Sequence, residues 1–167
     1  SLDEMLDVAS AASAGHFPTR NRLGIVTISG GIGVLTSDVA TAHGLEVPEL
    51  PAKAQRALKK LVPFAAVRNP VDTTAQVLND MPLFEQNLDT MLRHGDCDAM
   101  LVFLSTIGFS ERMVKLVRVV LENIRGEHPD DLIIMSMTCR PDDRQYLEGL
   151  KYLVIEDPNR AIRAIAA

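Results

Sequence analysis

The sequence predicts an α/β fold, a flavodoxin-like three-layer α/β/α sandwich built on a mainly parallel five-stranded sheet of order 2-1-3-4-5. Two observations carry this prediction. Short apolar segments alternate with longer helical patterns along the chain, which is the rhythm of a parallel sheet with crossover helices. The apolar segments are also hydrophobic almost throughout, as expected of strands that are covered on both faces.

Five segments are predicted to be strands, because each is short and apolar enough to lie inside such a sheet. They are residues 23–28, 45–50, 99–104, 132–137 and 152–155. Pro48 limits the second segment, since proline has no backbone N–H to donate to a ladder. Ligands of these sheets bind beyond the carboxyl ends of the strands, at the switch point between strands 1 and 3. The residues that follow those two strands are therefore the candidate site.

Helices are predicted between the strands from apolar spacing and from residues that begin or end helices. The segments are 2–12, 34–43, 51–62, 81–94, 111–124 and 159–166, and Asp142 and Asp143 are placed in the first turn of one more. Residues 13–21 are predicted to be a linker. We therefore divide the chain into residues 1–21, a helix and linker from a preceding domain, and residues 22–167, one flavodoxin-like domain.

Composition restricts the class of protein. The 167 residues suffice for one domain with one core, and 47% hydrophobic against 23% charged residues is unlike a disordered chain. No apolar run approaches the ~20 residues that span a bilayer, so we expect no membrane partner. The formal charge is −5 and no basic stripe is visible along the sequence, so we expect no nucleic-acid partner either.

Cysteine usage and the N-terminus indicate the surroundings of the chain. Cys97 and Cys139 are isolated from each other and from the histidines, which predicts neither a disulfide framework nor a metal site. We therefore expect reducing, cytoplasmic conditions. The first residues include no initiator methionine and no signal-peptide pattern, so we interpret them as the cut edge of a longer chain.

The four histidines are not predicted to be catalytic. His43 and His94 each precede a glycine at a helix end, where a cationic side chain favours the helix dipole. His16 and His128 lie in polar connecting stretches. None has a serine, cysteine or carboxylate at a recognisable catalytic spacing, so the sequence predicts no catalytic residue.

A glycine-rich turn follows the first predicted strand. Such a turn, running into a helix N-terminus, presents free backbone N–H groups and the positive end of the helix dipole, which suits a phosphate. Glycines here could instead serve only to pack strand against helix. The predicted phosphate-binding residues are Ser29, Gly30, Gly31, Ile32, Gly33 and Val34, with the helix beginning near Ile32.

The loop after the third predicted segment, 99–104, repeats this arrangement with hydroxyls and a glycine before another helix. Its candidate residues are Ser105, Thr106 and Gly108. Asn69 and Asp72 flank a Pro-Val pair, and their side chains are predicted to hold that loop in one conformation.

Several known nucleotide and flavin motifs do not match these turns. Residues 31–36 lack the third small residue of a dinucleotide fingerprint, and no Gly-Lys-Ser/Thr ending of a triphosphate loop is present. The chain has no tryptophan to form a flavin platform. A receiver domain needs an acidic residue where Ser105 and Thr106 stand. These classes therefore remain minor alternatives.

Four segments together resemble the nucleoside-diphosphate-forming acyl-CoA synthetases, which are relatives of succinyl-CoA ligase. They are residues 22–38 (RLGIVTISGGIGVLTSD), 44–50 (GLEVPEL), 69–73 (NPVDT) and 156–164 (EDPNRAIRA). The family pattern has Gly-Gly-Pro-Gly-Val after a strand, then Gly-Leu-Glu-x-Pro-Glu-Leu, Asn-Pro-Val-Asp and a closing Pro-x-Arg-Ala helix. Ile28 and Ile32 stand where the family more often has asparagine and proline. The resemblance covers nearly the whole chain and implies the family's flavodoxin-like ligase domain.

The resemblance also implies a function. Such enzymes interconvert acyl-CoA and phosphate with the free acid, CoA and a phosphorylated histidine, which then passes its phosphoryl group to a nucleoside diphosphate. The candidate turns would hold the phosphohistidine loop. None of the four histidines lies in the family's His-Thr-Gly or His-Ala-Gly context, and we expect no cofactor in this fragment.

The expected partners are the family's CoA-binding and ATP-grasp domains, which these residues do not include. The parent enzyme would use CoA, ATP/ADP and Mg, and this chain would assemble with its CoA-binding and ATP-grasp domains, being inactive alone. The alternative is a non-catalytic domain of the same fold that binds a ligand or partner, as in protein acyltransferase fusions.

Overall fold

The computed structural model describes residues 1–167, and their centre is a five-stranded sheet in which every strand pair is parallel. The strands are β1 (Leu23–Thr27), β2 (Val71–Asp72), β3 (Ala99–Gly108), β4 (Leu132–Cys139) and β5 (Leu153–Val154). Their order across the sheet is β2-β1-β3-β4-β5. The predicted fold class and strand order are confirmed.

Seven α-helices and one short 3-10 helix connect and flank the strands. They are α1 (Leu2–Ser13), α2 (Gly30–Ala42), α3 (Ala52–Leu61), η1 (Ala75–Asn79), α4 (Met81–His94), α5 (Glu111–Glu127), α6 (Pro141–Gly149) and α7 (Pro158–Ala166). Asp80 and Ser110 cap α4 and α5 as predicted, each accepting a hydrogen bond from a backbone N–H three residues on. None of these helices combines the length and the apolar content needed to cross a bilayer.

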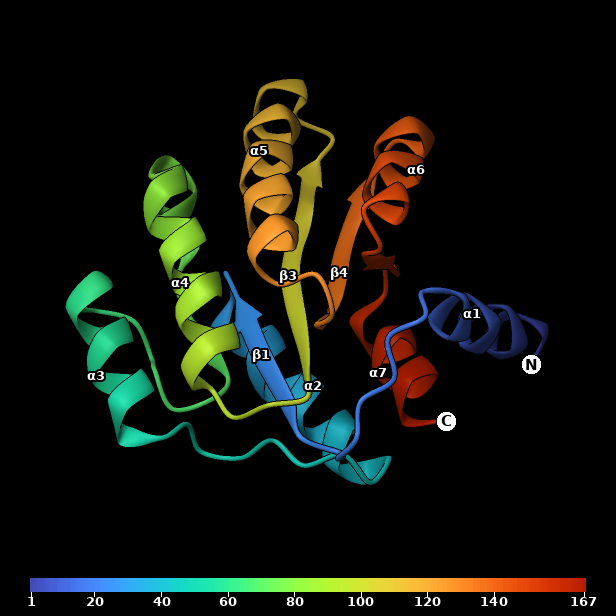
Figure 1. The fold of residues 1–167 in the computed structure, drawn as a ribbon, viewed down its shortest axis with the longest axis horizontal. Coiled ribbons are helices and arrows are strands. Elements are labelled where there is room, and N and C mark those ends of the chain that lie inside the picture. Colours follow the sequence, from blue (N-terminus) through green and yellow to red (C-terminus); the bar gives the residue numbers. More distant parts are fainter.

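The sheet divides the core into two layers, because successive side chains of each strand point to opposite faces. Val26, Val102 and Met135 lie in the larger cluster, which also holds the buried residues of α3, α4 and α5. Ile25 and Leu101 lie in the smaller cluster with residues of α2 and α7. Figure 1 shows this arrangement, with α4 and α5 in front of the sheet and α2 behind β1. Apolar strands thus face helices on both sides.

The predicted second strand is wrong. Within residues 45–50 only Glu46 pairs with the sheet, through an isolated bridge to Arg22. The strand beside β1 is instead β2, whose two residues Val71 and Asp72 pair with Val26 and Thr27. A strand of two residues directly after Pro70 has no periodicity, and the apolar run around Pro48 is the more conspicuous signal.

The Asn69 side chain extends the edge of β1 ahead of β2. Its Oδ1 accepts a hydrogen bond from the N–H of Ile25 at 2.9 Å, and its Nδ2 donates to the carbonyl of Leu23 at 3.0 Å. Nδ2 also donates to the carbonyl of Pro48 at 3.0 Å. One side chain therefore satisfies the backbone of β1 where a longer neighbouring strand would otherwise do so.

The strand β3 is longer than predicted. It continues past Leu104 to Gly108, because β4 also extends to Cys139 and pairs with it. The pairing has two irregularities, one on each side of Ser105, whose φ is +56°. The residues predicted to form a turn after this strand are therefore part of the strand.

An N-terminal helix lies against the C-terminal one. The guanidinium of Arg160 in α7 makes two hydrogen bonds to the carboxylate of Asp7 in α1, at 2.8 and 2.9 Å. No residue of α1 is fully buried. A bidentate ion pair thus helps to join the two terminal helices, which lie side by side in Figure 1.

We expect Asn69→Ala to lower the free energy of unfolding by about 1–3 kcal/mol, because the N–H of Ile25 and the carbonyl of Leu23 lose their partner at a buried strand. Urea unfolding of the chain measures this change. Asn79→Ala is the matched control, since Asn79 is exposed and makes no hydrogen bond through its side chain. Equal stability of the two variants would contradict the role of Asn69.

Candidate functional site

The α2 N-terminus lies at the carboxyl end of β1, as the doubly wound sheet requires. The chain leaves β1 at Thr27, Ser29 is extended with φ −146°, and the helix begins at Gly30. The predicted start near Ile32 is therefore too late by two residues. The glycines adopt helical geometry, and none of them has a positive φ. They form the first turn of the helix rather than a separate turn before it.

Three backbone N–H groups at this end donate to no group of the protein. The first intrahelical bond runs from Gly33 N–H to the carbonyl of Ser29 at 3.1 Å, which leaves the N–H groups of Gly30, Gly31 and Ile32 unpaired. The Ser29 hydroxyl makes no capping bond, and the first turn has no acidic residue. The positive end of the helix dipole is consequently open to an anion.

The glycines of this turn differ in the space around them. A Cβ on Gly33 would lie 3.1 Å from Pro70 Cβ and 3.2 Å from Thr27 Cγ2, so this glycine allows α2 to pack on β1. A Cβ on Gly31 would meet nothing within 4 Å. Strand–helix packing therefore accounts for Gly33, whereas Gly31 faces open space at the helix end.

Asp72 is the charged group closest to this helix end. One carboxylate oxygen accepts from the N–H of Thr74 at 2.9 Å. The other lies 2.9 Å from the position that a Cβ of Gly30 would occupy. Glycine at position 30 thus allows the carboxylate to approach the first turn of α2, where the dipole favours negative charge.

The second predicted edge differs from the first. Thr106 is exposed, and a Cβ on Gly108 would lie 2.5 Å from the carbonyl oxygen of Thr138, so β3 and β4 approach closely here. The helix that follows, α5, has its N-terminus already occupied. Ser110 accepts from the N–H of Met113, and Glu111 provides a negative charge in the first turn. Val34 is 62% exposed at the start of α2, and the open helix N-terminus is the one of α2 and not the one of α5.

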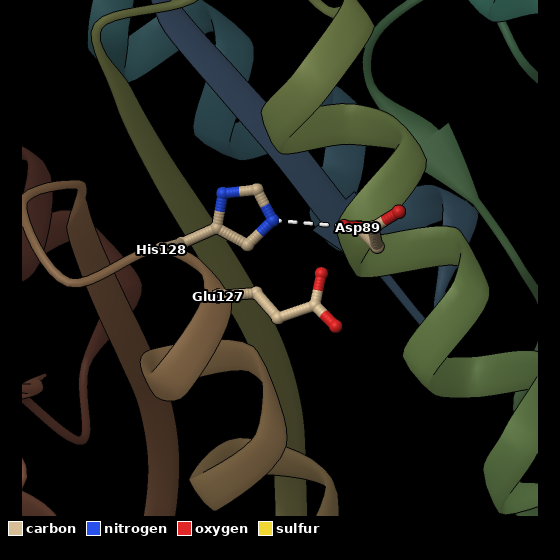
Figure 2. Close-up of side chains that lie close together, drawn as sticks. All are labelled: Asp89, Glu127 and His128. Carbon is tan, nitrogen blue, oxygen red and sulfur yellow. Dashed lines mark hydrogen bonds and ion pairs between the residues drawn. The ribbon is translucent and has the colours of Figure 1, made fainter.

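A second polar cluster lies at the opposite, amino-terminal edge of the sheet, between α4 and the end of α5. His128 is 8% exposed, and its Nε2 lies 2.8 Å from Asp89 Oδ1 and its Nδ1 3.0 Å from Asp131 Oδ2. Figure 2 shows Glu127 beside this pair, with its carboxylate directed toward Asp89. The His128 ring thus lies between a carboxylate of α4 and a carboxylate of the loop before β4.

Ligand atoms of Asp89, Glu127 and His128 lie within 4.8 Å of one another, close enough to consider a metal ion. Arg93 already supplies a cation there. Its Nε donates to Asp89 at 2.7 Å, and its Nη2 donates to Glu127. The cluster therefore forms an ion-pair network that joins α4 to α5.

Sequence reasoning missed this network. Asp131 follows His128 by three residues and offered a local signal, but Asp89 and Arg93 come from a different helix and offered none. Arg125 strengthens the same loop, because its guanidinium donates to the carbonyls of His128 and Asp131, both at 2.9 Å.

Both cysteines are free, as the sequence predicts. Cys97 packs beside Gly24, and burial raises the pKa of its thiol to about 11. Burial also raises the pKa of Cys139. Neither thiol has the lowered pKa of a nucleophilic cysteine.

Comparison with known protein families and sequences identifies related chains. The family model of the Ligase-CoA domain matches residues 23–154. Subunit alpha of the ADP-forming acetate–CoA ligase II of Pyrococcus furiosus is 44% identical over 75 residues, which is 44% of this chain and 16% of the relative. Subunit alpha of ligase I of the same organism is 24% identical over 170 residues, covering 99% of this chain and 36% of the relative. The chain thus spans about a third of that relative's length.

Solved structures share the fold. A protein of Pyrococcus horikoshii superposes with a TM-score of 0.82 at 22% identity, covering 99% of this chain and 39% of that protein. The apo form of the dinucleotide-forming acetyl-coenzyme A synthetase 1 of Candidatus Korarchaeum cryptofilum gives a TM-score of 0.79 at 22% identity, covering 99% and 36%. The arrangement of all five strands and their helices therefore recurs within longer chains.

We expect His128→Gln to lower the free energy of unfolding by about 1–2 kcal/mol, because glutamine has one amide nitrogen where the imidazole places one ring nitrogen near Asp89 and the other near Asp131. His43→Gln is the control, since His43 is exposed and makes no side-chain hydrogen bond. Urea unfolding at low ionic strength measures both. A His128 variant as stable as the His43 variant would show that the network does not join α4 to α5.

Proposed function

The chain belongs to the Ligase-CoA domain family, and from this premise we propose that it is one domain of a larger nucleoside-diphosphate-forming acyl-CoA synthetase. The parent enzyme would make acyl-CoA from a carboxylic acid, CoA and ATP through a phosphorylated histidine. The role of this domain would be to hold the phosphoryl group at a helix N-terminus. The relatives, named as acetate–CoA ligase subunits, support this reaction class.

The open N-terminus of α2 is the observation that carries the proposal. The N–H groups of Gly30, Gly31 and Ile32 are unpaired, and the helix has no side-chain cap and no acidic residue in its first turn. A phosphoryl oxygen would accept these hydrogen bonds and be stabilised by the helix dipole. Exposure of Gly31 and Val34 leaves room for a loop from another domain to bring the phosphohistidine to this end.

The Asp72 carboxylate would limit phosphate binding by this domain alone. It lies beside Gly30, so an arriving phosphoryl group would meet a like charge at one side of the helix end. Each exposed charge–dipole contact stabilises an anion by about 0.3–1 kcal/mol. We therefore assign firm binding to the assembled enzyme, where a second domain completes the site.

The remaining reactants fit other domains better. The α2 end offers backbone N–H groups but no basic side chain bonded there, and Asp72 provides one carboxylate. CoA, the ATP/ADP pair and Mg²⁺ would therefore bind to the CoA-binding and ATP-grasp domains of the parent enzyme. When bound, the nucleotide would supply or accept the phosphoryl group that this domain helps to hold.

We expect the chain alone to form no acyl-CoA from acetate, CoA and ATP, because the proposed phosphohistidine lies outside it. Chromatographic detection of the thioester measures this. The complete parent enzyme, assayed in parallel, should form it. Thioester formation by the chain alone would contradict its assignment as a non-catalytic domain of the ligase, and an inactive parent would contradict the ligase assignment.

We expect Gly31→Asp in the parent enzyme to lower the rate of histidine phosphorylation by acyl-CoA and phosphate by at least about tenfold. A carboxylate in the first turn of α2 would occupy the anion site and repel phosphate, while favouring the helix dipole. Folding should be retained, because a side chain at position 31 meets nothing within 4 Å.

Gly31→Asn is the matched control for that experiment. Asparagine has the same size without the charge, so it should retain at least half of the rate. The phosphorylated histidine, measured per folded molecule, reports the effect. If the Asp variant, the Asn variant and the wild type had equal rates, residues 29–34 would not bind the phosphoryl group.

A further inference from the structure

The basic residues of the chain are concentrated around α3. Residues 51–70 contain five lysines and arginines and no acidic residue, so the remaining 147 residues contain 12 basic and 22 acidic ones. The prediction that the chain has no basic stripe is therefore wrong for this one helix. The net charge of −5 conceals a basic segment on an acidic domain.

The exposed face of α3 has no internal counter-charge. Lys53, Arg56 and Lys60 recur at spacings of three and four residues, which places them along one side of the helix. All three are exposed, and none takes part in an ion pair with an acidic side chain. Lys59 donates to the carbonyl of Ala65 at 3.0 Å. Three cations are thus left to interact outside the domain.

The opposite face of α3 explains why these cations point outward. Ala54 and Leu58 are fully buried in the larger core cluster, and α3 packs on α4. Figure 1 shows α3 at the outer edge of this helical layer, with α4 on one side and no helix on the other. The larger surface cavities are lined by other elements. None of these five cavities is lined by a residue of α3.

An apolar patch adjoins the end of the basic face. Phe64 is 58% exposed, and Pro63 beside it is exposed as well. An aromatic ring next to arginine and lysine is the combination typical of protein–protein interfaces, in which the ring supplies buried area and the charges supply orientation.

We propose that α3 and Phe64 form a docking surface for an acidic segment of another domain or subunit of the parent enzyme. The proposal rests on the proposed function, which makes this chain one part of a larger assembly. Charge complementarity identifies the partner, because three unpaired cations along one side of a helix fit a row of carboxylates. Nucleic acid fits less well, since the rest of the domain is acidic and would repel it.

Zero-length cross-linking of the parent enzyme with a carbodiimide tests this surface. The reagent joins a lysine only to a carboxylate that it touches. We expect Lys53 and Lys60 to become linked to aspartates or glutamates outside residues 1–167, with yields that fall at 1 M salt because the contact is electrostatic. Lys115, which pairs with Glu111 at 3.0 Å, is the internal control and should link within the chain.

Charge reversal and rescue complete the test. Lys53→Glu combined with Lys60→Glu should remove the outside cross-links at both positions, and Lys substitution of the carboxylates linked in the wild type should restore them with the lysine and the carboxylate exchanged. Lys115→Glu combined with Lys151→Glu should leave the outside cross-links unchanged. Thermal unfolding of the Lys53 and Lys60 variants should match the wild type, because both side chains are exposed. Lys115→Glu should lower the unfolding temperature slightly, because it places a second carboxylate four residues from Glu111.

Absence of outside cross-links from Lys53 and Lys60 would overturn the proposal. So would binding of a labelled single-stranded DNA that Arg56→Glu abolishes, because the surface would then serve nucleic acid. Failure of the docking surface and failure of the proposed function remain distinguishable. A parent enzyme that forms acyl-CoA without these cross-links retains the function and loses only the docking surface.

Discussion

The close approach of α2 to the end of β1 is the constraint on which the candidate site depends. Thr27 is central to it, because its hydroxyl accepts from the N–H of Ser29 at 2.9 Å and donates to the Ser29 carbonyl at 3.0 Å. Its own carbonyl accepts from the N–H and the hydroxyl of Thr73. Gly33 then lets the helix lie against Thr27. The Ser29 hydroxyl makes no capping hydrogen bond, so the first-turn N–H groups stay open.

Sequence reasoning predicted the elements that have a clear hydrophobic pattern or a capping residue. It did not predict the strands whose position or length depends on pairing with residues far away in the sequence. The strands around Ile25, Leu101 and Ile134 are apolar throughout, and their burial on both faces followed from that pattern. The strand β2 could not be predicted in this way, since its identity depends on the Asn69 side chain bonding to β1 across more than 40 residues of sequence. The extension of β3 to Gly108 likewise depends on the length of β4, which polar residues such as Ser105 and Thr106 do not indicate.

The candidate site likewise has features that the local sequence predicts and features that depend on tertiary contacts. A glycine turn after an apolar strand places an anion site at a helix N-terminus from local chemistry alone, and the open α2 end has the geometry that such a site needs. Its neighbour Asp72 and the already capped α5 end are set by tertiary structure. The His128 network is also tertiary, because Asp89 lies 39 residues away in the chain. Local patterns therefore indicated which helix ends to consider, and contacts decided between them.

Some charged groups of this domain are paired inside it, whereas others have no full partner within the domain. At the amino-terminal edge of the sheet Arg93 pairs with Asp89 and Glu127, and Arg160 pairs with Asp7 between the two terminal helices. At α5 the negative charge of Glu111 meets the helix dipole within the domain. At the α2 end the Asp72 carboxylate approaches the first turn but accepts no hydrogen bond from its N–H groups, and the basic face of α3 has no internal counter-charge. A surface charge or dipole without a full internal partner attracts opposite charge, which is why the proposed phosphoryl site and the proposed docking surface fall at these two places.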